Sequence, residues 1–116
     1  MISLMTYEEL LKHLKDNAAA SAGAMTDDEA NAFYWSKEWA RKRKHVRKRD
    51  RDECVLCARH GRVTRKRLYV HHIKPLKGCY DLRLDDDNLI TLCYACHELV
   101  HNRQPIRREQ LRPEWW

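Results

Sequence analysis

The sequence predicts a small α+β domain, built on a four-cysteine zinc knuckle and preceded by N-terminal helices. Its 116 residues suffice for one compact domain but not for two. Cys54 and Cys57 form one Cys-x-x-Cys pair and Cys93 and Cys96 a second, the spacing typical of four thiolates on one zinc ion. Helical patterns fill the first part of the chain, whereas short apolar segments of strand type follow the first pair.

The first helix is expected to begin after Thr6, because Thr6 and Glu9 have the spacing of a capping box. Leucines then recur at helical spacing, and the pattern ends near Asn17. The following AAASAGA, residues 18–24, is expected to be a loose linker. Residues 1–24 are therefore expected to form a helix and linker arm ahead of the main domain, residues 25–116.

A second capping box, Thr26 with Glu29, predicts a longer helix with a break near Ser36. Four aromatic side chains of this segment are expected to pack against the domain: Phe33, Tyr34, Trp35 and Trp39. The helix continues into residues 41–51, where eight of eleven residues are Lys or Arg.

The charge distribution favours a polyanionic partner. The net charge is +6 and the pI about 9.2, and since residues 1–30 are acidic on balance, the basic excess lies in the rest of the chain. We expect DNA phosphates to be contacted by Arg47, Lys48, Arg51 and Lys74.

Short elements follow the basic helix. A strand is expected through LYVHHI, residues 68–73, ending before Pro75. Residues 77–87 are expected to form a polar loop. DNLITLC then predicts a second short strand, and CHELVH the start of a helix.

The five cysteines are expected to be reduced, since their number is odd and the start of the chain lacks the features of a signal peptide. We therefore expect a cytoplasmic protein. Four thiolates occupy all four coordination positions of a tetrahedral zinc ion, so the zinc is expected to be structural. Cys79 has no partner at this spacing and is expected to be an incidental thiol.

Four histidines lie among the cysteine pairs. His71 and His72 are adjacent in a predicted strand, so their side chains point to opposite faces and have different roles. His97 and His101, four residues apart in a predicted helix, share one face and are expected to converge on a metal ion. A neutral imidazole can also serve as a general base at neutral pH.

These residues resemble the HNH endonuclease motif, which has a ββα-metal (His-Me finger) fold. The resemblance lies in three segments between Cys54 and His101: VHHIKPL, DNL and LCYACHELVH. The flanks, FYWSKEWARKRKHVRKRD and LRPEWW, are similar to those of small phage-encoded HNH endonucleases. Residues 25–116 would then be the HNH nuclease domain.

The resemblance implies a role for each matching residue. His71 and His97 would bind the catalytic metal, and His72 would be the general base that activates water. His101 would complete the coordination or contact the phosphate. Asn88 would brace the loop and orient the base.

The implied activity is metal-dependent cleavage of DNA, as nicks or double-strand breaks, with little sequence specificity because the expected contacts go to phosphates. The catalytic ion would be Mg²⁺, Mn²⁺, Ni²⁺ or Zn²⁺. Many relatives have an acidic residue where His71 stands, and an all-imidazole site favours softer ions than magnesium. A carboxylate from Asp85, Asp86 or Asp87 is an alternative ligand.

Two other hypotheses remain. The chain would be a non-catalytic, zinc-stabilised DNA-binding module if the histidines were incidental. Alternatively, it would act with phage packaging proteins, for which the acidic N-terminal helix is a candidate docking surface. A membrane partner is not expected, because the sequence contains no run of 18 apolar residues.

Overall fold

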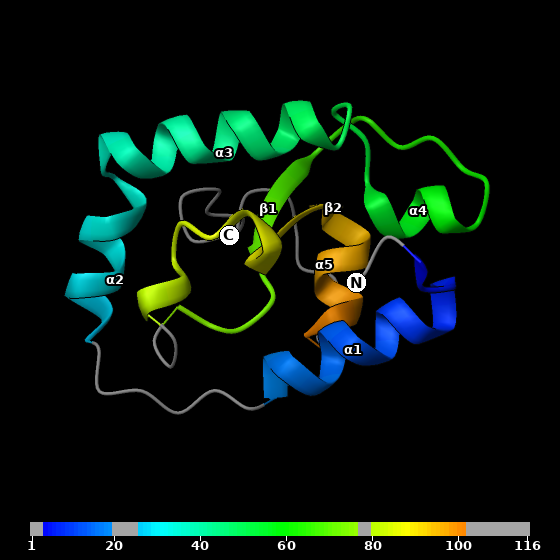
Figure 1. Ribbon diagram of the computed structural model, residues 1–116, viewed down its shortest axis with the longest axis horizontal. Helices are drawn as coiled ribbons and strands as arrows, with labels where there is room; N and C mark the ends of the chain where they lie inside the picture. The colour runs from blue at the N-terminus through cyan, green and yellow to red at the C-terminus, as the bar shows by residue number, and fades with distance from the viewer. Residues whose placement is uncertain (1–3, 20–25, 77–79, 102–116) are drawn as a thin grey trace.

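The computed structural model describes residues 4–19, 26–76 and 80–101 (Figure 1). The predictions for residues 20–24 and for Cys79 lie outside these ranges. The described part is an α+β fold, as the sequence predicts. Its elements in order are α1 Tyr7–Ala19, α2 Asp27–Tyr34, α3 Lys37–Arg49, α4 Val55–Arg59, β1 Leu68–His72, the 3-10 turns η2 Tyr80–Leu82 and η3 Asp86–Asn88, β2 Leu89–Cys93, and α5 Tyr94–Val100.

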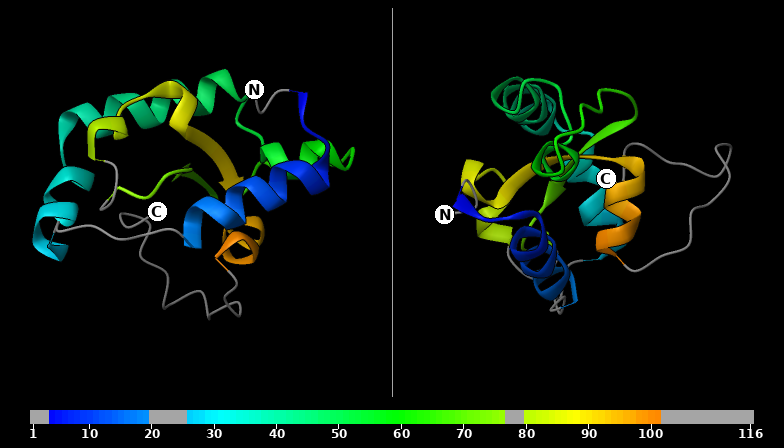
Figure 2. Two further views of the ribbon diagram at one scale, coloured as in Figure 1. Left: turned by 60° about the horizontal axis from the view of Figure 1, so that its bottom comes forward. Right: turned by 90° about the vertical axis from the view of Figure 1, so that its right-hand side faces the viewer.

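The two strands form an antiparallel sheet at the centre of the molecule. Leu68 pairs with Cys93 at one end, and His72 pairs with Leu89 at the other. Because successive side chains of a strand point to opposite faces, the pairing divides the sheet into two faces with different coverings. The helices α1 and α5 lie on one side of it and α3 on the other (Figure 2).

The first face is covered by α1, α4 and α5. Leu10 and Leu14 of α1 are fully buried there, against a cluster that also contains all four cysteines of the Cys-x-x-Cys pairs. The ring of Tyr7 stacks on that of His60 at 3.6 Å, and the Arg59 Nε–H donates to the Met5 carbonyl at 3.0 Å. The first helix thus packs on the knuckle and runs to Ala19, two residues beyond its expected end.

The second face is covered by α2 and α3. Its buried side chains come from both helices, both strands and the loop after β1: Ala30, Phe33, Trp39, Val46, Val70, Leu76 and Leu89. Thr26 and Glu29 form the expected capping box of α2, and the Ser36 side chain accepts from the Trp39 N–H to start α3. The break predicted near Ser36 is confirmed.

The packing expected of Trp35 is wrong. Its side chain is 69% exposed, whereas Phe33 and Trp39 are buried. Trp35 follows Phe33 by two positions, about 200° around a helix of 3.6 residues per turn, so the two side chains point in nearly opposite directions.

The basic helix α3 ends in a tight reversal of the chain. The Asp52 N–H donates to the Arg47 carbonyl at 2.7 Å and the Arg51 N–H to the Lys48 carbonyl at 3.1 Å, the bonding pattern of a Schellman motif. Arg51 has a φ of 60° and Asp52 one of 53°, where glycine is usual. This reversal ends two residues before Cys54.

None of the helices described is long and apolar enough to cross a membrane.

Candidate metal and catalytic centre

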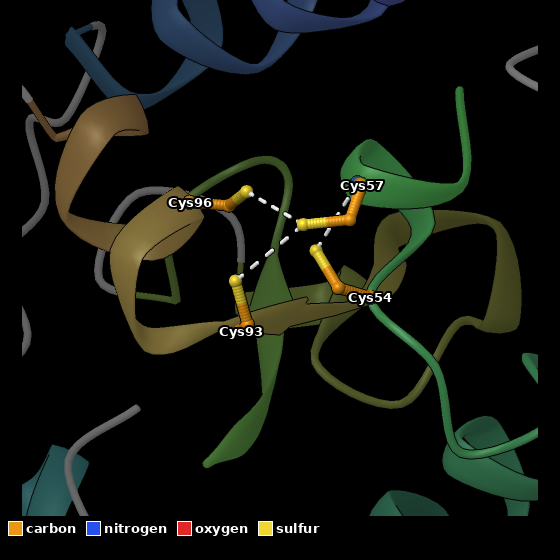
Figure 3. Close-up of side chains that lie close together, drawn as sticks. All are labelled: Cys54, Cys57, Cys93 and Cys96. Atoms are coloured by element: carbon orange, nitrogen blue, oxygen red, sulfur yellow. Dashed lines mark hydrogen bonds between the residues drawn. The ribbon is translucent and has the colours of Figure 1, made fainter. Parts of the chain in front are cut away.

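The four paired cysteines converge at one point between α4 and the start of α5 (Figure 3). All four are buried, and their sulfurs lie within 4.8 Å of one another. The Sγ of Cys57 is 3.9 Å from that of Cys93 and 3.7 Å from that of Cys96. A tetrahedral ion with Zn–S bonds of about 2.3 Å separates its sulfurs by about 3.8 Å, so this cluster fits zinc.

Thiol chemistry in the cluster also favours a cation. Hydrogen bonds from Cys54, and then from Cys96, lower the pKa of the Cys93 thiol, while the hydrogen bond with Cys93 raises the pKa of Cys54. The thiols thus compete for protons, since the hydrogen bond that favours the Cys93 thiolate favours the protonated Cys54. A bound divalent cation removes that conflict, because zinc takes its cysteine ligands as thiolates.

A second cluster joins β1 to α5. His71, His97 and His101 each place one ring nitrogen within 4.8 Å of the others. The ring centroids lie 5.2 Å apart between His71 and His97, and 4.5 Å apart between His97 and His101. His71 and His97 are buried, and His101 caps the end of α5. Three imidazoles in contact form a donor set suited to one divalent transition-metal ion.

His72 lies on the opposite face of the sheet, as the strand alternation predicts. Its ring stacks on Trp39 with centroids 4.9 Å apart, and Phe33 and Tyr34 approach it edge-on at 5.9 and 6.0 Å. The His72 Nε2–H donates to the Arg83 carbonyl at 3.0 Å. Burial lowers the pKa of His72 to about 4, and the hydrogen bond to Arg83 opposes this only in part, so the ring is neutral at pH 7.

Asn88 lies at the end of η3 and binds the loop that follows β1. Its Oδ1 accepts from the Lys74 N–H at 2.8 Å, and its Nδ2 donates to the carbonyls of Lys74 at 3.2 Å and Leu82 at 3.3 Å. Its own carbonyl accepts from the Ile73 N–H at 2.8 Å. The side chain, 6% exposed, therefore joins the segment after β1 to the segment that supplies the Arg83 carbonyl.

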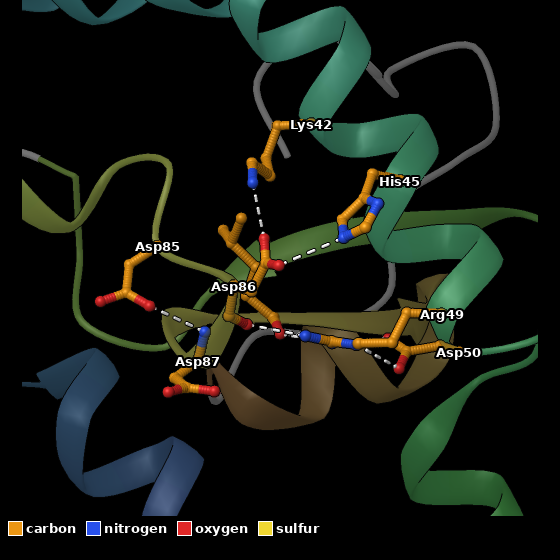
Figure 4. Close-up of polar contacts among 8 residues, drawn as sticks. Lys42, His45, Arg49, Asp50, Asp85, Asp86 and Asp87 are labelled. Atoms are coloured by element: carbon orange, nitrogen blue, oxygen red, sulfur yellow. Dashed lines mark hydrogen bonds and ion pairs between the residues drawn. The ribbon is translucent and has the colours of Figure 1, made fainter.

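The acidic run before Asn88 is held by α3 (Figure 4). The Asp86 carboxylate accepts from Lys42 at 2.7 Å and contacts the His45 Nε2 at 3.1 Å. The hydrogen bond from Lys42 holds the pKa of Asp86 below its usual value. The carboxylate described beside the three-histidine cluster is that of Glu98, 3.8 Å from the His97 Nδ1, and not one of residues 85–87, so their alternative ligand role gains no support from this geometry.

The predicted phosphate contacts differ in their surroundings. Lys48, Arg51 and Lys74 are exposed, whereas Arg47 forms an ion pair with Asp52 at 3.1 Å. Arg49, in the same basic run, donates from its guanidinium to the carbonyls of Asp86 and Leu89, both at 2.7 Å. Part of the basic run therefore holds the fold together.

Sequence reasoning missed two features of the centre. The aromatic wall around His72 comes from α2 and α3, which the motif does not include, although the clustering of Phe33, Tyr34 and Trp39 was visible. The hydrogen bond to the Arg83 carbonyl had no signal in the sequence, because any residue type supplies a backbone carbonyl.

Comparison with known proteins gives one consistent result. Residues 54–103 match the model of the HNH endonuclease family. A probable HNH endonuclease of Lactococcus phage SK1 is 37% identical over 71 residues, which are 58% of this chain and 72% of that protein.

A solved structure is also similar: the HNH endonuclease of the deep-sea thermophilic bacteriophage GVE2, crystallised with a manganese ion. The match has a TM-score of 0.58 and 37% sequence identity, and covers 75% of this chain and 85% of the other. The solved structure therefore resembles the fold that the sequence predicts for this chain. It also holds a divalent metal ion, as the sequence predicts here.

Proposed function

The chain belongs to the HNH endonuclease family, and from this premise we propose that it is a metal-dependent DNA endonuclease with His72 as general base. The observation that carries the proposal is that two adjacent histidines of β1 lie in different surroundings on opposite faces of the sheet. His71 joins the cluster with His97 and His101, while His72 is held on the other face with a defined orientation.

The hydrogen bond to Arg83 supports the role of His72. Because Nε2 carries the hydrogen that it donates to the carbonyl, a neutral ring has its lone pair on Nδ1. Nδ1 makes no hydrogen bond among the described residues and is thus the nitrogen that would take the proton of the attacking water. Asn88 would act indirectly, by holding the loops on both sides of this hydrogen bond.

His71, His97 and His101 would hold the catalytic ion, His101 as the third ligand. When bound, such an ion supplies positive charge to the phosphoryl and leaving oxygens. Three imidazoles suit Mn²⁺, Ni²⁺ or Zn²⁺ better than Mg²⁺, so we expect magnesium to be the weakest activator. The four-cysteine cluster would hold a structural zinc ion and take no part in the chemistry.

Low sequence specificity follows from the nature of the available contacts. The candidates Arg47, Lys48, Arg51 and Lys74 are cations suited to phosphates, which carry no sequence information. Cleavage should therefore weaken as the salt concentration rises. A library of random duplexes cut at one site alone would contradict this.

A link to genome packaging remains a hypothesis. The similarity to phage proteins gives it a setting, the cytoplasm of an infected host, and the exposed Glu8 and Glu9 of α1 offer an acidic surface for a partner. Co-purification of phage packaging proteins with the tagged chain, abolished by Glu8→Lys/Glu9→Lys, would support it. Co-purification that both charge reversals leave intact would exclude this surface.

The decisive experiment is conversion of supercoiled plasmid to nicked or linear forms, with Mg²⁺, Mn²⁺, Ni²⁺ or Zn²⁺ supplied separately. We expect cutting by the parent and a loss of about 100-fold or more in His72→Ala, in line with the contribution of a general base. His13→Ala is the matched control, because His13 lies on α1 and bonds only within that helix among the contacts described.

Binding of Mn²⁺, measured by calorimetry, separates the two adjacent histidines. His71→Ala should weaken binding at least tenfold, whereas His72→Ala should leave it within about threefold. A folded, zinc-loaded parent that binds DNA but cuts it with none of the four ions would instead support the non-catalytic DNA-binding module.

A further inference from the structure

A second basic segment lies outside the residues considered so far. Residues 61–67, here called the knuckle loop, connect α4 to β1, and four of the seven are Lys or Arg with no acidic residue. All four basic side chains are exposed: Arg62, Arg65, Lys66 and Arg67. Arg65 has Glu53 at 3.9 Å, a long and exposed ion pair that a phosphate can replace.

The knuckle loop is fixed to the cysteine cluster by its backbone. The Cys54 N–H donates to the Thr64 carbonyl at 2.9 Å, and the Arg62 N–H to the Cys57 carbonyl at 3.0 Å. At the end of the loop, the Tyr94 N–H donates to the Arg67 carbonyl at 2.9 Å. Each bond involves a cysteine of the cluster or its neighbour, so the loop is already ordered and a ligand need not order it.

Arg67 is the most constrained of these cations. Its φ of 55° is one that glycine adopts far more easily, yet the position holds an arginine. Its guanidinium lies 4.3 Å from the centre of the Tyr94 ring, which holds the charge over the start of α5. Backbone strain retained at a charged, exposed residue is a reason to look for a function there.

Arg67 is the first of three residues, in and just before β1, whose side chains contact α5 or the residue that follows it. Their three partners follow one another in the same order along the chain. The three rungs are Arg67 on Tyr94, Tyr69 beside His97 at 6.2 Å, and His71 beside His101 at 5.1 Å. With about 3.3 Å per strand residue, four residues place Arg67 about 13 Å from His71, the axial rise of about four base pairs.

We propose that the knuckle loop binds the DNA backbone about four base pairs from the phosphate being cleaved. The proposal rests on the proposed cleavage of DNA and adds a second contact, supplied by the zinc knuckle rather than by α3. Arg67 would bind the nearest phosphate, and Arg65 and Lys66 the phosphates beyond it. The knuckle would thus set the position of the duplex relative to the histidine cluster.

The test measures binding, independently of cleavage. A fluorescein-labelled 24-base-pair duplex is titrated with the full chain carrying His72→Ala, without added divalent ion, at several salt concentrations. In that background, Arg65→Ala/Lys66→Ala should reduce the slope of log K against log salt by about 1.8, and Arg67→Gly by about 0.9. The control, Lys12→Gln/Lys15→Gln, also removes two positive charges, but from α1, and should leave the slope unchanged.

Arg67→Gly also separates binding from stability. Glycine accepts the φ of this position, so the melting temperature should not fall through backbone strain while DNA affinity drops severalfold. Equal slopes for the parent, both loop variants and the control would overturn this proposal while leaving DNA binding intact. Equal losses in the loop variants and the α1 control would also overturn it, since net charge alone would then explain them. A parent that does not bind the duplex would overturn the proposed function as well.

Discussion

The side chains of His71 and His72 are adjacent in the chain but lie in different environments. His71 faces α5 and two further imidazoles, whereas His72 faces the aromatic side chains of α2 and α3. A metal ligand and a base have opposite requirements, since the ligand gives its lone pair to the ion and the base must keep one for a proton. In the proposed roles of His71 and His72, the pleat of β1 would meet both requirements with adjacent residues.

Trp39 is expected to position the His72 ring. It is 1% exposed and stacks on His72, so Trp39→Leu keeps an apolar side chain but removes the stacking surface. We expect kcat for plasmid cleavage to fall about tenfold with little change in KM, because orientation of the base matters most in the reaction step. Trp39→Phe, which retains a ring, should recover most of the loss.

Val46→Ala is the control for this prediction. Val46 is fully buried in the same cluster as Trp39 and belongs to the same helix, and no ring contact joins it to His72. Its truncation should cost about 1 to 3 kcal/mol of stability while kcat stays near that of the parent below the unfolding transition. A matching fall of kcat in Val46→Ala would assign the effect of Trp39 to stability alone.

Residue by residue, the sequence predicts what local spacing determines. The opposite directions of His71 and His72 follow from strand alternation, and the meeting of His97 with His101 follows from helical spacing. The partners of His72 do not follow from either rule. Trp39 and the Arg83 carbonyl reach it only through the packing of α3 and the course of the loop before η3.

Among the elements, the short turn η3 connects the basic helix to the loops of the centre. Asp86 of this turn is bound by Lys42 and His45 of α3. Asn88 of the same turn bonds Lys74 in the loop after β1 and the Leu82 carbonyl. The first set joins partly exposed side chains, whereas the second is made by the buried side chain of Asn88. The two should therefore differ in their contribution to stability.

We expect Asn88→Ala to destabilise the fold by about 2 to 4 kcal/mol, because it removes three hydrogen bonds made by a buried side chain and leaves the backbone groups of two loops without this partner. Asp86→Ala should cost about 1 kcal/mol or less, the usual range for a partly exposed ion pair. Unfolding by urea, followed by circular dichroism, measures both. An Asp86→Ala variant as unstable as Asn88→Ala would show that the tie to α3, rather than Asn88, holds this turn.

Element boundaries were predictable where a cap marks them. The capping boxes of Thr6 and Thr26 and the break at Ser36 are all confirmed. The end of α1 was not, because alanines carry no stop signal. The exposure of Trp35 follows from its position about 200° from Phe33 around the helix, which the expected packing of all four aromatic side chains overlooked.

At the scale of the whole molecule, the four-cysteine cluster is one of the contacts that join distant parts of the chain. It links α4 to β2 and α5, and the helix α1 packs over it. A domain of this size has a modest core, so zinc bound at this cluster would contribute a large share of the folding free energy. The sequence predicts the ligands through their spacing, but not that α1 covers them.

Loss of one zinc ligand should therefore unfold the protein. Cys57→Ser is expected to purify without zinc and without a cooperative thermal transition, measured by elemental analysis and circular dichroism. Cys79→Ser should keep one zinc per chain and the melting temperature of the parent, because Cys79 has no partner at Cys-x-x-Cys spacing. A well-folded, zinc-free Cys57→Ser would contradict the structural role of the ion.

We expect the packing of α1 on the cysteine cluster to affect how quickly a bound zinc ion exchanges. Leu10 and Leu14 lie fully buried in the same cluster as the sulfurs, so a chelator gains access when this helix undocks. The rate of zinc release is then set by the opening of α1 and not by the strength of the Zn–S bonds alone. A chain lacking residues 1–19 should give up its zinc faster at an unchanged chelator concentration, and equal rates would show that the helix does not guard the ion.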